Sequence, residues 1–219
     1  MQRWMLFSLD NLVTITYTMH NNDGITYMND NRGPWLLTQS GKKFYLASPE
    51  VGDFDVEDAA TGLSKTCRFN GQLNPLFEDS IYSVAQHSVY VLWHVRMRGY
   101  VREQRWALAH DFLEYPYGDM ISPLKTLFPE FSALEARGAA LMREQFDIPF
   151  DEDIERVVHQ SDKALGILES KAITSVPSEL WDVPMSLPYD ITAIDPDFHC
   201  WSPKKARMEF LAAWEEAFA

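Results

Sequence analysis

The chain has 219 residues, of which 46% are hydrophobic and 13% aromatic, and this size and composition fit one large domain with a single core. Its 19 basic and 32 acidic residues give a formal net charge of -13, which argues against a broad nucleic-acid or anionic-membrane surface held by charge alone. The two cysteines are too few for a disulfide framework, and Ser8, Asp10 and Asn11 interrupt the hydrophobic opening before it could serve as a signal or membrane segment. We therefore expect a cytoplasmic protein without a membrane anchor.

Residues 1–50 have the pattern of a small strand-containing addition. Residues 12–19 (LVTITYTM) and 42–48 (KKFYLAS) are rich in β-branched and aromatic side chains, and the turn clusters NNDG and NDNRG separate such runs. This pattern predicts two or three short strands joined by tight turns.

From residue 55 onward the hydrophobic period changes to that of helices. The predicted helices cover residues 55–65, 83–99, 101–114, 129–146 and 151–170. Ser83 and Asp151 are predicted N-caps, and Gly99 is a predicted helix stop.

The last fifty residues, 171–219, complete the same domain. Five prolines between residues 171 and 203 predict an irregular wrap, and residues 204–219 predict a closing amphipathic helix with Met208, Leu211, Ala212 and Trp214 toward one side. The fold class that we predict is mainly all-α, a helical bundle of one domain over 1–219 with a small N-terminal strand addition.

Polar residues interrupt the apolar stripes of two predicted helices. His87 lies within the stripe of Val84, Val91 and Val95, and Asp162 lies within the stripe of Ile154, Val158, Leu165 and Leu168. A third helix ends in the adjacent pair His110-Asp111, whose directions differ by roughly 100° on a helix. An unpaired buried carboxylate costs several kcal/mol, and a divalent metal offsets this cost by binding imidazole and carboxylate together.

Any one of these positions alone is better explained without a metal. A single histidine on an apolar face is more often a hydrogen-bonded core residue, and a single aspartate often pairs with an arginine. The order His, His-Asp, Asp is much less expected by chance, so we predict that His87, His110, Asp111 and Asp162 bind a metal. His94 and His159 are alternatives that would join or replace a ligand, or simply pack.

This order resembles that of the HD-domain metal-dependent phosphohydrolases. The segments FDVEDAATGLSKTCRFNGQ, YSVAQHSVYV, ALAHDFLEYPYGDMISPLK and PEFSALEARGAALMREQF are similar to those of the small HD nucleotidases, which include bacterial 5'-deoxynucleotidases and phage dATP triphosphohydrolases. The resemblance covers roughly residues 40–170. Phe112, Leu113, Tyr115 and Pro116 are bulkier than the residues often found within this motif, which leaves the shape of the sugar or base pocket open.

The resemblance implies a role for each matching residue. It implies that the four predicted ligands hold a catalytic divalent ion, that Glu114 and Asp119 act beside the water and the leaving oxygen, that Arg68 faces the substrate phosphate, and that Lys125 contacts the outer phosphates. The ligand set suits zinc, cobalt, manganese or iron, and magnesium less well. Relatives in this family often assemble as homo-oligomers, and a phage-encoded member would work in the host cytoplasm.

Each role has an alternative. Glu114 would otherwise be a solvated acid at a helix end, Asp119 a local turn cap, and Arg68 an exposed ion pair with Glu57 or Asp58.

The expected activity is hydrolysis of a deoxynucleoside triphosphate, dATP by resemblance, to the deoxynucleoside and triphosphate. The same residues would serve a 5'-deoxynucleotidase acting on monophosphates, or, more distantly, an enzyme that cleaves cyclic nucleotides. The remaining alternative is a non-catalytic nucleotide-binding or assembly protein whose metal serves folding.

Overall fold

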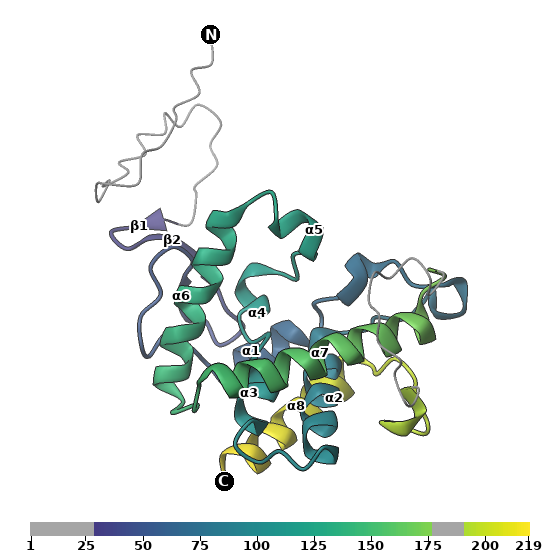
Figure 1. Cartoon of the computed structure of the whole chain (residues 1–219). Helices are drawn as coiled ribbons and strands as arrows, with labels where there is room; N and C mark the ends of the chain where they lie inside the picture. The colour runs from purple at the N-terminus through teal and green to yellow at the C-terminus, as the bar shows by residue number, and fades with distance from the viewer. Residues whose placement is uncertain (1–28, 177–190) are drawn as a thin grey trace.

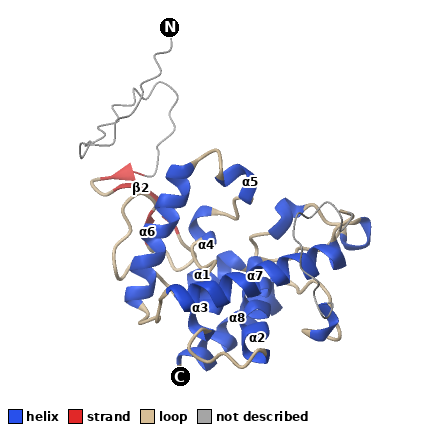
Figure 2. Ribbon diagram, in the orientation of Figure 1, coloured by secondary structure: helices blue, strands red, loops and turns tan. Residues whose placement is uncertain are grey.

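The computed structural model describes residues 29–176 and 191–219, which form a mainly helical body with a small antiparallel sheet (Figure 1, Figure 2). The fold class predicted from the sequence is therefore confirmed. The helices are α1 (Val56–Leu63), α2 (Val84–Met97), α3 (Gln104–Ala109), α4 (Glu114–Tyr117), α5 (Ser122–Lys125), α6 (Pro129–Gln145), α7 (Glu152–Ile173) and α8 (Pro203–Phe218). Short 3₁₀ helices lie at η1 (Arg68–Gly71), η2 (Pro75–Phe77) and η4 (Ile191–Ala193).

The sheet consists of β1 (Asn29–Asp30), β2 (Gly33–Leu37) and β3 (Lys43–Tyr45), antiparallel in that order. The turn cluster at residues 29–33 joins β1 to β2 as predicted. Phe44 in β3 is fully buried, and its ring meets those of Phe54 and Tyr115 edge-on. These contacts attach the sheet to the helical body. The strand expected over 42–48 is confirmed at 43–45, and the one expected over 12–19 lies outside the described residues.

Helix α2 is the central helix of the body, because α1, α3, α7 and α8 all pack against it. The Ser83 hydroxyl caps its first turn by accepting a hydrogen bond from the Gln86 amide at 3.2 Å, and Gly99, at φ +80°, follows its last turn. The Asp151 carboxylate caps α7 in the same way, accepting from the Ile154 amide at 2.9 Å. The predicted caps and helix stop are confirmed, and α2 is buried on nearly all sides.

The helix predicted over 101–114 is interrupted. Helix α3 ends at Ala109, residues 110–113 form a turn, and α4 begins at Glu114. In this turn the amides of Phe112 and Glu114 bond to carbonyls three residues earlier, which tightens the chain. Hydrophobic periodicity continues through the turn because Phe112 and Leu113 are themselves buried, and this continuity concealed the break.

The face predicted for the closing helix is confirmed for Trp214 and for the half-buried Leu211, and it is wrong for Met208 and Ala212, which are exposed. The buried side of α8 carries Ala206, Phe210, Ala213 and Trp214, whereas Met208 is 56% exposed. Trp214 sets this orientation, since it packs against Phe112 and Phe146 as well as against its neighbours on α8. A sequence of alternating small and large apolar residues allows more than one such face, and the aromatic contacts select between them.

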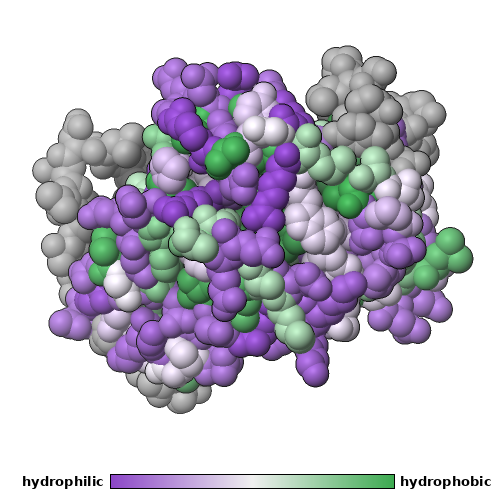
Figure 3. Space-filling model, turned by 90° about the horizontal axis from the view of Figure 1, so that it is seen from below, coloured by the Kyte–Doolittle hydropathy of each residue, from purple (hydrophilic) through white to green (hydrophobic). Residues whose placement is uncertain are grey.

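The segment predicted as an irregular wrap is described on either side of residues 177–190, which lie outside the described residues. Helix α7 continues through Ile173, and η4 occupies residues 191–193. In the described part of the chain, no helix combines the length and hydrophobicity needed to cross a membrane. On the face seen in Figure 3, the described residues are mostly hydrophilic, and the hydrophobic ones lie in small separate patches.

Candidate metal centre and catalytic site

The segment before α2 is fixed to the start of that helix. The Arg68 amide donates to the Tyr82 carbonyl at 2.9 Å, and the Val84 amide donates to the Thr66 carbonyl at 3.0 Å. Directly after Arg68, Phe69 has φ +54° and so adopts the left-handed conformation, which costs an L-residue roughly 1–2 kcal/mol. This strained loop holds Arg68 close to His87, one turn into α2.

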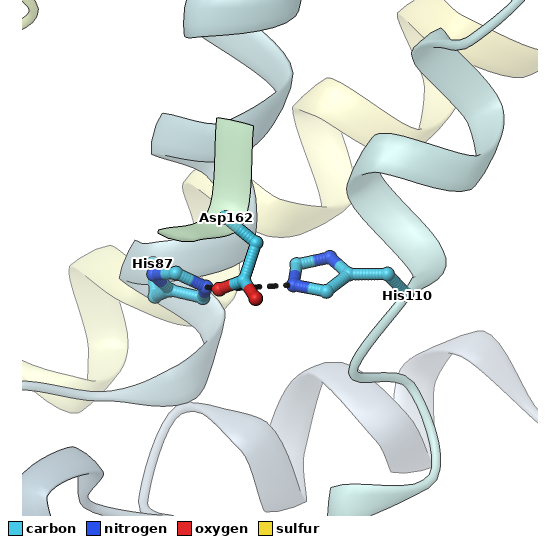
Figure 4. A group of neighbouring side chains, drawn as sticks. All are labelled: His87, His110 and Asp162. Atoms are coloured by element: carbon cyan, nitrogen blue, oxygen red, sulfur yellow. Dashed lines mark ion pairs between the residues drawn. The ribbon is translucent and has the colours of Figure 1, made fainter. Parts of the chain in front are cut away.

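Three of the predicted ligands come together from three helices. His87 lies on α2, His110 follows the end of α3, and Asp162 lies on α7, and one ligand atom from each falls within 4.8 Å of the others. Figure 4 shows the Asp162 carboxylate between the two imidazole rings. Its Oδ1 atom is 3.1 Å from His87 Nε2 and 3.9 Å from His110 Nε2. This group can hold a metal ion.

The fourth predicted ligand, Asp111, lies beside this group. Its Oδ2 atom is 3.3 Å from His110 Nε2, 3.7 Å from His87 Nε2 and 3.4 Å from Arg68 Nη1. The structure thus brings all four predicted ligands to one place. Among the described residues, His94 and His159 are not part of the group: His94 is buried later on α2, and His159 is exposed on α7.

The hydrogen bonds of the two imidazoles fix which nitrogen faces the centre. His87 Nδ1 lies 2.7 Å from a Glu169 carboxylate oxygen, and His110 Nδ1 lies 2.9 Å from the Ala107 carbonyl. Both partners are acceptors, so each Nδ1 carries the proton and donates it. Both Nε2 atoms are buried without a hydrogen-bond partner among the described residues. This arrangement fits a metal ion, because a histidine that binds a metal through one ring nitrogen usually donates a hydrogen bond from the other.

The charges around the centre favour a cation. Burial and the Arg68 charge lower the pKa of His87, but Glu169 and Asp162 outweigh both and raise it to about 9. Burial likewise acts to raise the pKa of Asp162, yet the two histidines hold it at about 2. Without a metal, the site therefore keeps its carboxylates ionised and collects protons on its imidazoles. A divalent ion would replace those protons.

Glu169 is a residue of this centre that the sequence analysis did not predict. It is fully buried on α7, seven residues after Asp162, which places both on the same face of the helix. One oxygen meets His87 Nδ1, and the other lies 3.4 Å from Arg68 Nε. The sequence does carry a signal for it, since Glu169 is an acid directly after Leu168, the last residue of the apolar stripe that contains Asp162.

Both predicted acids lie near the metal centre. Glu114 is only 6% exposed, and its Oε2 atom is buried without a hydrogen bond among the described residues. Burial, together with the charges of Asp111 and Asp119, raises the pKa of Glu114 well above its usual range. Burial also raises the pKa of Asp119, although Arg68 opposes this change. The alternative of a solvated acid is therefore wrong for Glu114.

Arg68 does not form the exposed ion pair that was its alternative. Glu57 pairs with Arg207, and Asp58 accepts hydrogen bonds from Ser40. The Arg68 guanidinium instead lies among the carboxylates of the centre, within 4.0 Å of three of them: Asp111, Asp162 and Glu169. A positive charge at this position balances part of their charge and leaves the guanidinium close to any group bound there.

A cavity of about 410 Å³ opens onto the centre. It is lined by residues of α3, α4, α5, α6 and α7 and of the loops between them: Trp106, His110, Asp111, Leu113, Glu114, Lys125, Glu135, Ala136, Ala139, Arg143, Phe150 and Glu155. Four of the residues predicted from the sequence therefore share one space. Lys125 is half-buried there, and its ammonium group lies 2.9 Å from a Glu135 carboxylate oxygen.

Comparison with known proteins finds relatives without an assigned activity. The chain is 33% identical over 145 residues to an uncharacterized protein of Rhodobacter capsulatus, and the match covers 64% of this chain and 72% of that protein. It is 36% identical over 115 residues to the uncharacterized protein YfdR of Escherichia coli K12, and this match covers 52% of this chain and 60% of YfdR. No family model matches the chain.

Proposed function

The chain belongs to the family of the Rhodobacter capsulatus protein, and we propose that it is a metal-dependent phosphohydrolase of the HD-domain type that acts on deoxynucleotides. The preferred reaction converts a deoxynucleoside triphosphate, dATP by resemblance, into the deoxynucleoside and triphosphate. One observation carries the proposal: two imidazole Nε2 atoms and the Asp162 carboxylate converge on one point, and His110 of this group lines a cavity together with the buried acid Glu114.

His87, His110, Asp111 and Asp162 would hold the ion. Zinc, cobalt, manganese and iron all suit these nitrogen and oxygen donors, and magnesium suits them less well. A bound divalent ion supplies polarisation of a phosphate oxygen and a lower pKa for a water molecule. Glu169 and the Ala107 carbonyl keep the two rings in the required tautomer.

The protein's own residues account for the proton and the phosphate charge. Hydrolysis forms a bond from the water oxygen to the α-phosphorus and breaks the bond to the 5'-oxygen, which must gain a proton. Burial beside two other acids raises the pKa of Glu114 well above its usual range, so this residue can give a proton to the leaving oxygen. Asp119 would orient the water, and the planar guanidinium of Arg68 would bind the phosphate oxygens.

A 5'-deoxynucleotidase acting on monophosphates is the second candidate, since the same metal ligands, Arg68 and acids would serve it. A non-catalytic metal site is the more distant one. The buried Glu114, whose pKa is raised well above its usual range, favours catalysis over that alternative, because a metal that serves folding alone needs no such acid.

The test is hydrolysis of a panel of ribo- and deoxynucleotides by metal-stripped protein reloaded with each metal, with the phosphorus products separated by chromatography. We expect deoxynucleoside and triphosphate from dATP, and orthophosphate alone would select the nucleotidase. Asp162→Ala should abolish turnover, whereas Asp153→Ala, at an exposed acid of the same helix, should not. Equal turnover by both variants, or no turnover by the wild type with any metal, would contradict the proposal.

A further inference from the structure

One side of the cavity is formed by α6. Glu135, Ala139 and Arg143 lie four residues apart, so they share one face of the helix and span about 12 Å. The alanine side chain between the two ends leaves the space open. On the opposite side, Trp106 lies one helical turn before His110, so the end of the cavity at Arg143 and Trp106 is close to the metal ligands.

Arg143 is held at this end by aromatic rings. Its guanidinium carbon lies 3.8 Å from the centre of the Phe150 ring and 4.9 Å from that of Trp106, and the two rings meet edge-on at 5.3 Å. The Trp106 ring is itself fixed, because its indole N–H donates to a Glu155 carboxylate oxygen at 2.7 Å. Stacking of this kind holds a guanidinium plane in place while leaving its N–H groups available.

Among the described residues, no carboxylate lies within 4.0 Å of the Arg143 guanidinium, and its side chain makes no hydrogen bond. The other cation of the cavity, Lys125, differs in this respect, because Glu135 neutralises it. The charge of Glu155 acts on Arg143 by favouring its charged form, but the Glu155 carboxylate already accepts a hydrogen bond from Trp106. Arg143 is thus a fixed positive charge that shares its cavity with the metal ligands and has its donors unused.

We propose that Arg143 binds the outer phosphates of a nucleoside triphosphate whose α-phosphate lies beside His110 and Asp111. This inference rests on the proposed function and favours its triphosphate form, because a monophosphate has no outer phosphates for Arg143 to bind. A planar guanidinium matches phosphate oxygens with paired hydrogen bonds. A nucleobase suits the same place less well, since the guanidinium already covers the faces of Phe150 and Trp106.

The test compares Arg143→Gln and Arg143→Lys with the wild type by calorimetric titration of the metal-loaded protein with inorganic triphosphate and with orthophosphate. Arg156→Gln is the matched control, because Arg156 is exposed on α7 and pairs with Asp153. Loss of charged hydrogen bonds should raise the Kd of triphosphate in Arg143→Gln by about 10- to 100-fold and leave that of orthophosphate within about twofold. Arg143→Lys keeps the charge and should lie between, and it replaces the glutamine variant if that variant fails to fold.

Kinetics separate this inference from the proposed function. For a wild type that hydrolyses dATP, the KM for dATP should rise with the triphosphate Kd in Arg143→Gln, and an unchanged KM would overturn the inference alone. If the wild type hydrolyses no nucleotide, the proposed function fails, and the titration still decides whether Arg143 binds triphosphate. Equal binding of triphosphate by the wild type and Arg143→Gln, or equal weakening of triphosphate and orthophosphate, would overturn the inference in either case.

Discussion

Replacement of Glu169 by glutamine tests how the site is organised, because this residue is fully buried behind His87 and Arg68. One of its oxygens accepts the Nδ1 proton of His87 at 2.7 Å, and the other lies 3.4 Å from Arg68 Nε. Glutamine has nearly the same shape and can still accept one hydrogen bond, but it removes the negative charge. The substitution therefore weakens the orientation and basicity of one metal ligand without opening a cavity.

The expected effect follows from the burial of this contact. Loss of the carboxylate partner of a metal-binding histidine typically lowers metal affinity about 10- to 100-fold, which corresponds to about 1.4–2.7 kcal/mol. Because Glu169 is fully buried, we expect an effect near the upper end. Loss of its charge also leaves Arg68 with fewer buried acids nearby, so a lower melting temperature of the metal-free protein should accompany the weaker binding.

The assay is competition between the protein and a chromophoric chelator for zinc or cobalt, with circular dichroism to confirm the fold. Glu152→Gln is the control, because Glu152 is an exposed acid in the first turn of the same helix. An affinity in Glu169→Gln equal to that of the control, in folded protein, would refute the reasoning that the carboxylate fixes His87 for metal binding.

Three further results are expected. Glu114→Gln should lower kcat about 10²- to 10⁴-fold and leave the metal content, measured by mass spectrometry, unchanged. Loss of bound metal in parallel with kcat would instead make Glu114 part of the metal-binding site. Metal affinity should increase as pH rises toward about 9, because His87 in the metal-free protein holds a competing proton up to that pH. Metal titrations at a series of pH values measure this, and an affinity that does not change with pH would contradict it. Gly62→Ala should destabilise the protein by about 1–3 kcal/mol in denaturant unfolding, since the added carbon would lie 2.8 Å from the Tyr115 Cβ, whereas Gly166→Ala, with more space, should not.

The sequence was informative where a polar residue replaced an apolar one at a buried position. His87 and Asp162 each stand in a stripe whose other members proved buried, and the structure brings them together with His110. Burial of a charge or an imidazole requires a partner, so such interruptions point to a site before the fold is known. The helix caps at Ser83 and Asp151 were equally readable, because capping depends on residues adjacent in sequence.

Features that depend on packing between distant segments could not be read in this way. The aromatic contacts of Trp214 decide which side of α8 is buried, and these contacts reach residues more than sixty positions away. The role that we propose for Arg143 depends on its contacts with Phe150 and Trp106, and Trp106 lies 37 positions earlier in the chain. Glu169 could have been predicted from the sequence, because it follows Asp162 by seven residues and so lies on the same face of α7.

The central claim is that His87 and His110 present their Nε2 atoms to one divalent ion. X-ray absorption spectroscopy of the zinc-loaded protein tests it most directly. We expect two imidazole nitrogens at about 2.0–2.1 Å from zinc, together with carboxylate oxygens, and one imidazole fewer in His110→Ala. A zinc ion that shows no imidazole scattering, or a spectrum unchanged by that substitution, would contradict the account.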